Sequence, residues 1–82
     1  MEKAQKFLES IVKELVEFPN EVRVGSRTDE MGVLLTLHVA QTDMGKVIGK
    51  EGQTANAIRT LLRIVGAKNN SRVTMKIAEP NE

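Results

Sequence analysis

Large apolar side chains recur at every second position from residue 33 to residue 39, the period of a β-strand with one buried face. They are Val33, Leu35, Leu37 and Val39. The chain has 82 residues and no cysteine, so neither a disulfide nor a thiolate metal site can replace an apolar core. Helices of the same chain must therefore cover this face, which predicts a small α+β fold.

The segments around this strand have recognisable periods. Residues 2–17 predict an amphipathic helix that Pro19 ends. Val22 opens an alternating segment that joins the strand through a turn at residues 29–32, so the two strands form an antiparallel hairpin. His38 lies on the face of the strand opposite its apolar residues and is treated as a surface residue.

The second half continues with two helices and a strand. Thr42-Asp43 offers an N-cap for a short helix over 44–48. A longer helix is expected over 53–65, with Gly66 as its C′ residue, followed by a turn at Asn69-Asn70 and a strand over 71–78. The order is α-β-β-α-α-β: a three-stranded sheet with three helices on one face. Residues 1–78 form one domain in this interpretation, and residues 79–82 a flexible tail.

Charge is divided unequally along the chain. The total is +1, but residues 1–30 hold seven acids and five bases, a sum of −2, whereas residues 31–78 hold two acids and seven bases, a sum of +5. A basic surface that binds anions is one interpretation of the second half. A set of solvated helix and strand faces is the other.

Composition excludes several classes of function. A single histidine and no cysteine leave no metal motif, and Asp43 and Glu51, eight residues apart across an irregular segment, make no convincing acid–base pair. We therefore expect no catalysis, cofactor, metal or small-molecule substrate. The charged start and the lack of a long apolar run predict a cytoplasmic protein without membrane contact.

The sequence Gly49-Lys50-Glu51-Gly52 separates the two helices expected in the second half of the chain. A Walker A loop would require glycine at Met44 and a hydroxyl residue at Glu51, and a dinucleotide fingerprint would require glycine at Val47. What remains is a Gly-x-x-Gly loop, in which glycine lets a sugar-phosphate chain approach and the next helix offers amide donors. A plain tight turn between helices is the alternative.

In this context the chain resembles the KhpA-type small bacterial proteins that consist of a single KH domain. The resemblance covers nearly the whole chain and rests on residues 45–52 (GKVIGKEG), Thr54-Ala55 and residues 57–62 (AIRTLL). It implies a type II KH fold whose loop grips the backbone of unpaired RNA. It also implies an RNA chaperone or post-transcriptional regulator. The RNA-binding residues it implies are Lys46, Val47, Gly49, Lys50, Glu51, Gly52, Thr54 and Ala55.

The resemblance gives these residues separate roles. The two glycines permit close approach, and Lys46 and Lys50 neutralise phosphate. Val47 and Ala55 shape an apolar groove, while Ile48 is either groove or core. Thr54 caps the helix or binds phosphate, and the cap is favoured. Glu51 places a carboxylate beside the expected RNA path, and Gln53 and Asn56 stand where similar proteins often carry basic residues. We therefore expect modest affinity for RNA.

Apolar residues extend around about half of the 53–65 helix, more than packing on one sheet requires. We expect Ala57, Leu61 and Ile64 to form a self-association or partner surface, unless the first helix covers them. The resemblance implies a homodimer and a larger KH-containing RNA-binding partner. The alternative function is therefore a KH-fold dimerisation or protein-interaction module with weak RNA contact.

Overall fold

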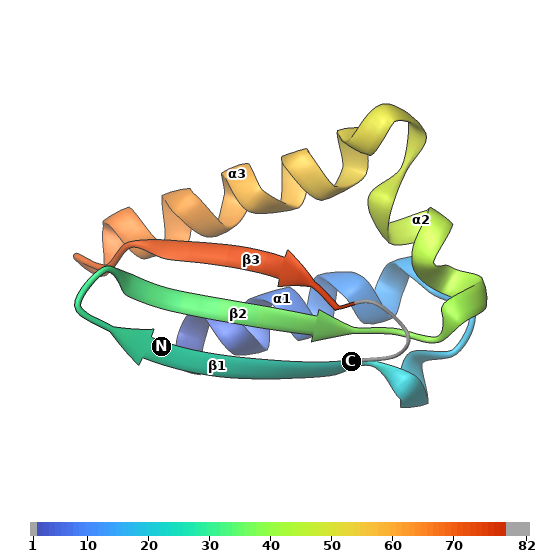
Figure 1. Cartoon of the computed structure of the whole chain (residues 1–82), viewed down its shortest axis with the longest axis horizontal. Helices are drawn as coiled ribbons and strands as arrows, with labels where there is room; N and C mark the ends of the chain where they lie inside the picture. Colours follow the sequence, from blue (N-terminus) through green and yellow to red (C-terminus); the bar gives the residue numbers. More distant parts are fainter. Residues whose placement is uncertain (1, 79–82) are drawn as a thin grey trace.

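The computed structural model describes residues 2–78, and the tail expected at 79–82 lies outside that range. Six helices and strands follow in the expected order α-β-β-α-α-β (Figure 1). They are α1 (Glu2–Leu15), β1 (Arg23–Asp29), β2 (Gly32–His38), α2 (Met44–Ile48), α3 (Gln53–Lys68) and β3 (Val73–Ile77). Three single 3₁₀ turns connect them: η1 (Pro19–Glu21), η2 (Gln41–Asp43) and η3 (Lys50–Gly52). The predicted α+β fold class is confirmed.

The three strands form one mixed sheet in the order β1-β2-β3. β1 pairs with β2 as the predicted antiparallel hairpin, and β3 joins the other edge of β2 in parallel. In this register Leu35 stands opposite Ser26 on one side and Met75 on the other. Side chains of directly opposed residues lie on the same face of a sheet. The face that carries the buried residues of β2 therefore also carries Met75 of β3.

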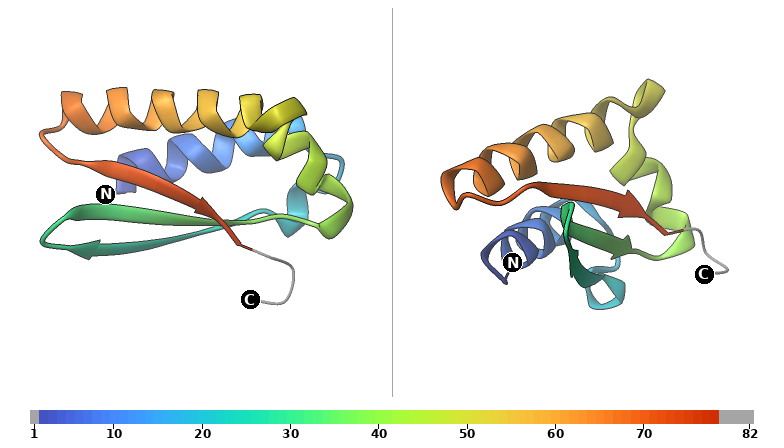
Figure 2. Two further views of the ribbon diagram at one scale, coloured as in Figure 1. Left: turned by 45° about the horizontal axis from the view of Figure 1, so that its top comes forward. Right: turned by 60° about the vertical axis from the view of Figure 1, so that its left-hand side comes forward.

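The core lies between this face and the helices. α1 buries Ala4, Leu8 and Val12, and α3 buries a stripe that includes Ile58 and Leu62. Both helices lie on the same side of the sheet, whereas α2 packs against α3 and α1 beyond the end of β2 (Figure 2). The Gly-x-x-Gly segment, between α2 and α3, is therefore held at the edge of the helical layer.

The first helix is two residues shorter than predicted because its last amides find other acceptors. It ends at Leu15, and the amides of Glu17 and Phe18 donate to the Asp43 side chain instead of continuing the helix. Asp43 occupies the N-cap position of α2, as the sequence indicated, but its side chain forms no hydrogen bond to the first amides of α2. The Asp43 carboxylate caps the end of α1, 26 residues earlier in the chain.

Gly66 is not the C′ residue of the long helix. α3 continues to Lys68 before the turn at Asn69-Asn70, and Gly66 is buried inside it. A Cβ atom at Gly66 would lie 2.6 Å from the Ser71 carbonyl oxygen and 2.9 Å from Val73 Cγ2. The absence of a side chain lets β3 start directly against α3, and the Ser71 amide donates to the Gly66 carbonyl at 2.8 Å.

We predict that Gly66→Ala lowers the melting temperature by roughly 5–10 °C, because the added methyl group must push the backbone before β3 away from α3. Gly45→Ala is the matched control, since Gly45 is also helical and a Cβ there meets nothing within 4 Å. That control should match or exceed the parent in stability. Thermal unfolding followed by circular dichroism measures both, and a parent-like melting temperature for Gly66→Ala would contradict the prediction.

Candidate nucleic-acid interface

The Gly-x-x-Gly segment is a compact loop with an unusual backbone. Gly49 has φ 75° and ψ 176°, Glu51 has φ 55° and ψ 27°, and Gly52 has φ 76° and ψ 10°. The conformation of Gly49 is essentially restricted to glycine, while that of Glu51 and Gly52 is left-handed helical. The Gly49 amide closes α2 by donating to the Gly45 carbonyl, and α3 begins immediately after Gly52. The loop lies at the amino end of α3 and projects away from the sheet (Figure 1).

The two glycines of the loop face different surroundings. A Cβ at Gly49 would overlap the side chain of Thr54 and lie only 2.7 Å from its Cβ, so this glycine is required by the protein's own packing. A Cβ at Gly52 would have no neighbour nearer than Asn56 Nδ2 at 4.0 Å. Only Gly52 therefore leaves an open approach to the backbone from solvent.

Thr54 does not cap α3, contrary to the favoured sequence interpretation. The N-cap position belongs to Gly52, and no side chain bonds to the first amides of the helix. The left-handed Glu51 and Gly52 place the helix start one residue before Thr54, whose side chain packs on Gly49 instead. The amino end of a 16-residue helix thus has no side-chain acceptor, and amide donors there suit an anion.

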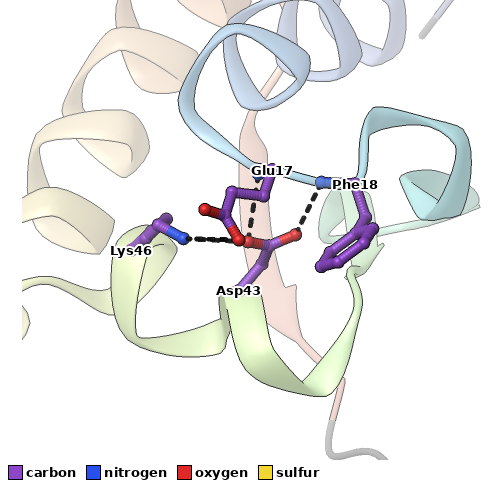
Figure 3. A network of polar contacts seen from close by, with 4 residues as sticks. All are labelled: Glu17, Phe18, Asp43 and Lys46. Carbon is purple, nitrogen blue, oxygen red and sulfur yellow. Dashed lines mark hydrogen bonds and ion pairs between the residues drawn. The ribbon is translucent and has the colours of Figure 1, made fainter.

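The two lysines expected to neutralise phosphate differ in how free they are. Lys50 is exposed and makes no ion pair or hydrogen bond to any residue in the described range. Lys46 Nζ lies 3.4 Å from Asp43 Oδ1 and 3.7 Å from Glu17 Oε2 (Figure 3). Lys46 is therefore partly exposed but already paired with two carboxylates, whereas Lys50 has no partner among residues 2–78.

The apolar residues beside the loop are placed differently from the sequence interpretation. Val47 is fully buried and Ala55 is 4% exposed, so little of either side chain reaches the surface of the protein. Ile48, which the sequence left as either groove or core, is 38% exposed. Ile48 supplies the apolar surface next to Gly49 that was expected of Val47.

A polar pair near the start of α3 was missed in the sequence. Arg59 donates through Nη1 to Asn56 Oδ1 at 3.2 Å and through Nε to the Met75 carbonyl at 3.3 Å. Asn56 lies one helical turn after Gly52, so this pair continues the polar surface from the loop toward β3. Their i, i+3 spacing was the available signal, but it could not show that β3 would supply the second acceptor.

The Asp43 carboxylate fixes the geometry below the loop. Its side chain is fully buried, and it accepts the Glu17 amide at 3.1 Å and the Phe18 amide at 3.0 Å (Figure 3). Burial alone would raise the pKa of Asp43. The two amide hydrogen bonds and the Lys46 ammonium outweigh burial, so the pKa is lowered from its ordinary value of 3.8. Asp43 is therefore ionised at neutral pH and holds Lys46 and the end of α1 together.

We predict that Asp43→Asn lowers the melting temperature at pH 7 by roughly 5–10 °C, because the amide group cannot accept both backbone bonds and keep the ion pair. A lowered pKa stabilises the fold above the unfolded value, and this contribution is lost as the pH falls through the folded value. The gap between parent and variant should therefore narrow below about pH 3.8.

Thermal unfolding of both proteins between pH 7 and pH 2.5 measures this gap. Asp29→Asn is the control, because its exposed carboxylate also accepts a backbone amide, that of Met31 at 2.8 Å. It should have a much smaller effect at pH 7. A difference between Asp43→Asn and parent that stays constant down to pH 2.5 would contradict the assigned linkage.

The apolar surface of α3 is not covered by α1. Ile64 is 61% exposed, Leu61 is 42% exposed, and Ala57 is also exposed. α1 packs against the sheet and a different side of α3, so the interpretation in which the first helix covers these residues is wrong. The three residues form an exposed apolar patch, called the α3 patch below.

Within residues 2–78, no three His, Asp or Glu side chains lie together in an arrangement that would hold a metal ion. In the same part of the chain, no helix has the length and apolar character needed to cross a bilayer. The loop and its surroundings are thus the best-defined candidate site.

A small α+β fold with a Gly-x-x-Gly loop between two helices defines a KH-type domain, and comparison with known proteins agrees. The family model for the KH domain of KhpA and KhpB matches residues 5–77. The chain therefore belongs to the KhpA/KhpB KH domain family.

Several curated relatives are similar over almost their whole length. "RNA-binding protein KhpA" of Clostridium acetobutylicum is 48% identical over 73 residues, which are 89% of this chain and 97% of the relative. The proteins of the same name from Chlamydia pneumoniae and Listeria monocytogenes are 47% and 40% identical. Each alignment covers 92% of this chain, with 96% and 99% of the relative.

Among solved structures, the crystal structure of Aquifex aeolicus Era is similar in fold. The TM-score is 0.63 at 16% identity, and the match covers 90% of this chain but 29% of that one. At this identity the likeness concerns the fold alone. It indicates that the same α+β arrangement also occurs as part of a longer protein.

Proposed function

We propose that this protein binds single-stranded RNA without catalysing a reaction, and that the loop Gly49–Gly52 holds the RNA backbone. Family membership supports RNA as the ligand, because the curated relatives are named RNA-binding proteins. One structural observation carries the assignment to the loop: Gly52 is open to solvent directly before an uncapped helix, beside Lys50, which has no partner within residues 2–78.

Each of these features suits a phosphate. Glycine lets the sugar-phosphate chain approach the backbone, the first amides of α3 donate hydrogen bonds, and the positive end of the helix dipole favours an anion. Lys50 adds a mobile positive charge. None of these contacts distinguishes one base from another, so selectivity for sequence should be low, as expected of an RNA chaperone or a broad post-transcriptional regulator acting in the cytoplasm.

The charge around the loop limits the affinity. Lys46 is held by Asp43 and Glu17, and Glu51 lies next to Lys50. One or two neutralised phosphates would give a logarithmic salt dependence of roughly −0.7 to −1.4 for single-stranded RNA. Apolar contact with Ile48 and hydrogen bonds from Asn56 and the loop amides supply the remaining affinity in this proposal.

We predict that Lys50→Asp combined with Glu51→Asp lowers affinity for a single-stranded oligoribonucleotide at least tenfold and leaves the melting temperature nearly unchanged. The variant keeps both glycines, and aspartate tolerates the left-handed conformation of residue 51 well. It places a second carboxylate where the phosphate would lie. Amide chemical shifts of residues 49–54, followed while ¹⁵N-labelled protein is titrated with the oligonucleotide at 50 mM salt, measure the affinity at the loop.

Lys3→Asp is the control, because it changes the net charge by the same −2 at the far end of α1 (Figure 1). It should bind RNA nearly as well as the parent. Parent-like binding by the loop variant would show that the loop is not the RNA site, whatever the rest of the protein binds.

A second candidate function is assembly through the α3 patch. Ala57, Leu61 and Ile64 are exposed in a chain of only 82 residues. We propose that the patch pairs two copies of this chain, or one copy with a larger KH-containing RNA-binding protein. Burial of large aliphatic side chains at about 25 cal/mol per Å² is the driving force in either case. Such an assembly would place two Gly-x-x-Gly loops on one particle.

We predict that Ile64→Glu keeps the protein at its monomer mass of 9.1 kDa at concentrations where the parent forms dimers. A carboxylate in the patch would have to be buried without a partner, which is strongly unfavourable. Sedimentation equilibrium over a hundredfold range of concentration measures the mass. Ser10→Glu, which adds the same charge on the exposed face of α1, should associate like the parent. Equal masses for parent and Ile64→Glu at every concentration would exclude self-association through the patch.

A further inference from the structure

The sheet has a second face, which the helices leave uncovered. Because the residues of β2 alternate, Leu34, Thr36 and His38 point away from the core while their neighbours are buried. The register places Arg23, Gly25 and Arg27 of β1, and Thr74 and Lys76 of β3, on this same side. We call this surface the outer sheet face. It lies on the side of the sheet opposite α1 and α3 (Figure 2).

Positive charge dominates the outer sheet face. Arg23 and Arg27 are exposed, four residues apart on one strand and hence about 13 Å from each other. Neither makes a hydrogen bond or ion pair with another residue in the described part of the chain. Lys76 stands in the row of Gly25 and Thr36, two strands across and about 10 Å away.

The outward positions of the three strands hold one acid, Asp29, at the hairpin end. Its carboxylate already accepts the Met31 amide at 2.8 Å. Arg23 and Arg27 thus give the outer sheet face two cations without a partner among residues 2–78, against this one carboxylate. Around the loop, by contrast, the charges of Lys46 and Lys50 are opposed by those of Asp43, Glu17 and Glu51. The stronger positive surface of the sheet and loop regions is therefore the outer sheet face.

Gly25 is the second observation that indicates a ligand. Its φ is not in the positive range, and an added Cβ would meet only Thr36, at 4.0 Å, which is an ordinary contact. Neither backbone conformation nor packing therefore requires glycine there, although glycine weakens a strand. Glycine inside a strand often marks the close approach of a ligand or another backbone. Gly25 leaves the backbone of β1 without a side chain between Arg23 and Arg27.

The hairpin end of the same face offers apolar surface next to Arg27. A shallow hollow there is lined by Asp29, Met31, Leu34 and Thr74, and Met31 is 71% exposed. Leu34 stands directly opposite Arg27 in the register. Single-stranded RNA carries phosphates, which suit the arginines, and bases whose flat faces can lie against Met31 and Leu34. An acidic peptide supplies the negative charge but lacks such bases, so RNA fits this surface better.

We propose that the outer sheet face is a second RNA-binding surface, on which Arg23 and Arg27 contact phosphates and Gly25 lets the RNA backbone approach the sheet. The proposal rests on RNA being the ligand of this protein but not on the loop. The two surfaces lie in different places, the loop at the amino end of α3 and the outer sheet face on the side of the sheet opposite α1 and α3 (Figure 2), so each can hold its own short RNA segment. One chain then holds two RNA segments at once, as a protein that brings RNA strands together would need to.

The test is a titration of ¹⁵N-labelled protein with a single-stranded pentaribonucleotide, followed by amide chemical shifts and by the binding stoichiometry. In the parent we expect shifts in two separate groups, one around Gly52 and one around Gly25 and Thr36, with two oligonucleotides bound per chain. In the loop variant Lys50→Asp, Glu51→Asp, only the outer-face shifts should remain. In Arg23→Thr, Arg27→Thr, only the loop shifts should remain, and affinity for a longer oligonucleotide should fall roughly tenfold at 50 mM salt.

Two further variants separate contact from folding and from net charge. Gly25→Thr suits a strand and has room, so it should raise the melting temperature while weakening the outer-face shifts. Lys3→Gln with Lys68→Gln removes two charges from the helical layer and should leave both groups of shifts unchanged. Parent protein without outer-face shifts, or loss of those shifts in the loop variant, would overturn the proposal. Outer-face shifts without loop shifts would instead refute the loop site and leave the second surface standing.

Discussion

The buried Asp43 carboxylate determines where the Gly-x-x-Gly loop lies. It accepts two amides from the chain just after α1 and pairs with Lys46 on α2, so it joins the first helix to the segment that carries the loop. α2 has only five residues, too few to be stable alone. Its position must come from tertiary contacts: this network on its polar side and fully buried Val47 on its apolar side. The direction in which the chain enters Gly49 follows from those two contacts.

The same network has a consequence for electrostatics. Using Lys46 to neutralise Asp43 and Glu17 removes it from the phosphate-binding charge that the sequence suggested. The +5 of residues 31–78 is also divided in space. Lys46 pairs with Glu17 just after α1, Arg59 donates to a carbonyl of β3, and Lys76 lies on the outer face of the sheet. A sum over a segment cannot reveal this division, since neighbours in the chain point to different faces and meet partners from the acidic first half.

Regular periods made most of the fold predictable. The alternation in β2 correctly indicated that Val33, Leu35 and Leu37 are buried, because it extends over several repeats. Failures occurred where local signals were short or ambiguous. Five residues of α2 could not show whether Val47 or Ile48 faces the core. A glycine at position 66 is compatible with two roles, the end of a helix or a site where another segment packs closely on the helix. Only the parallel pairing of β3 with β2, which brings Val73 against Gly66, shows that the second role applies.

The candidate site was predictable in kind but less so in detail, and the reason is the backbone of the loop. A Gly-x-x-Gly pattern indicates tight turning, yet it does not tell which glycine serves the protein and which is left open. Packing of Thr54 on Gly49 assigns the first glycine to the fold and so leaves Gly52 for a ligand. This division also explains how the loop tolerates Glu51. In its left-handed conformation residue 51 belongs to the turn itself, and the helix amides after Gly52, rather than the charges on the loop, become the main reason for an anion to bind there.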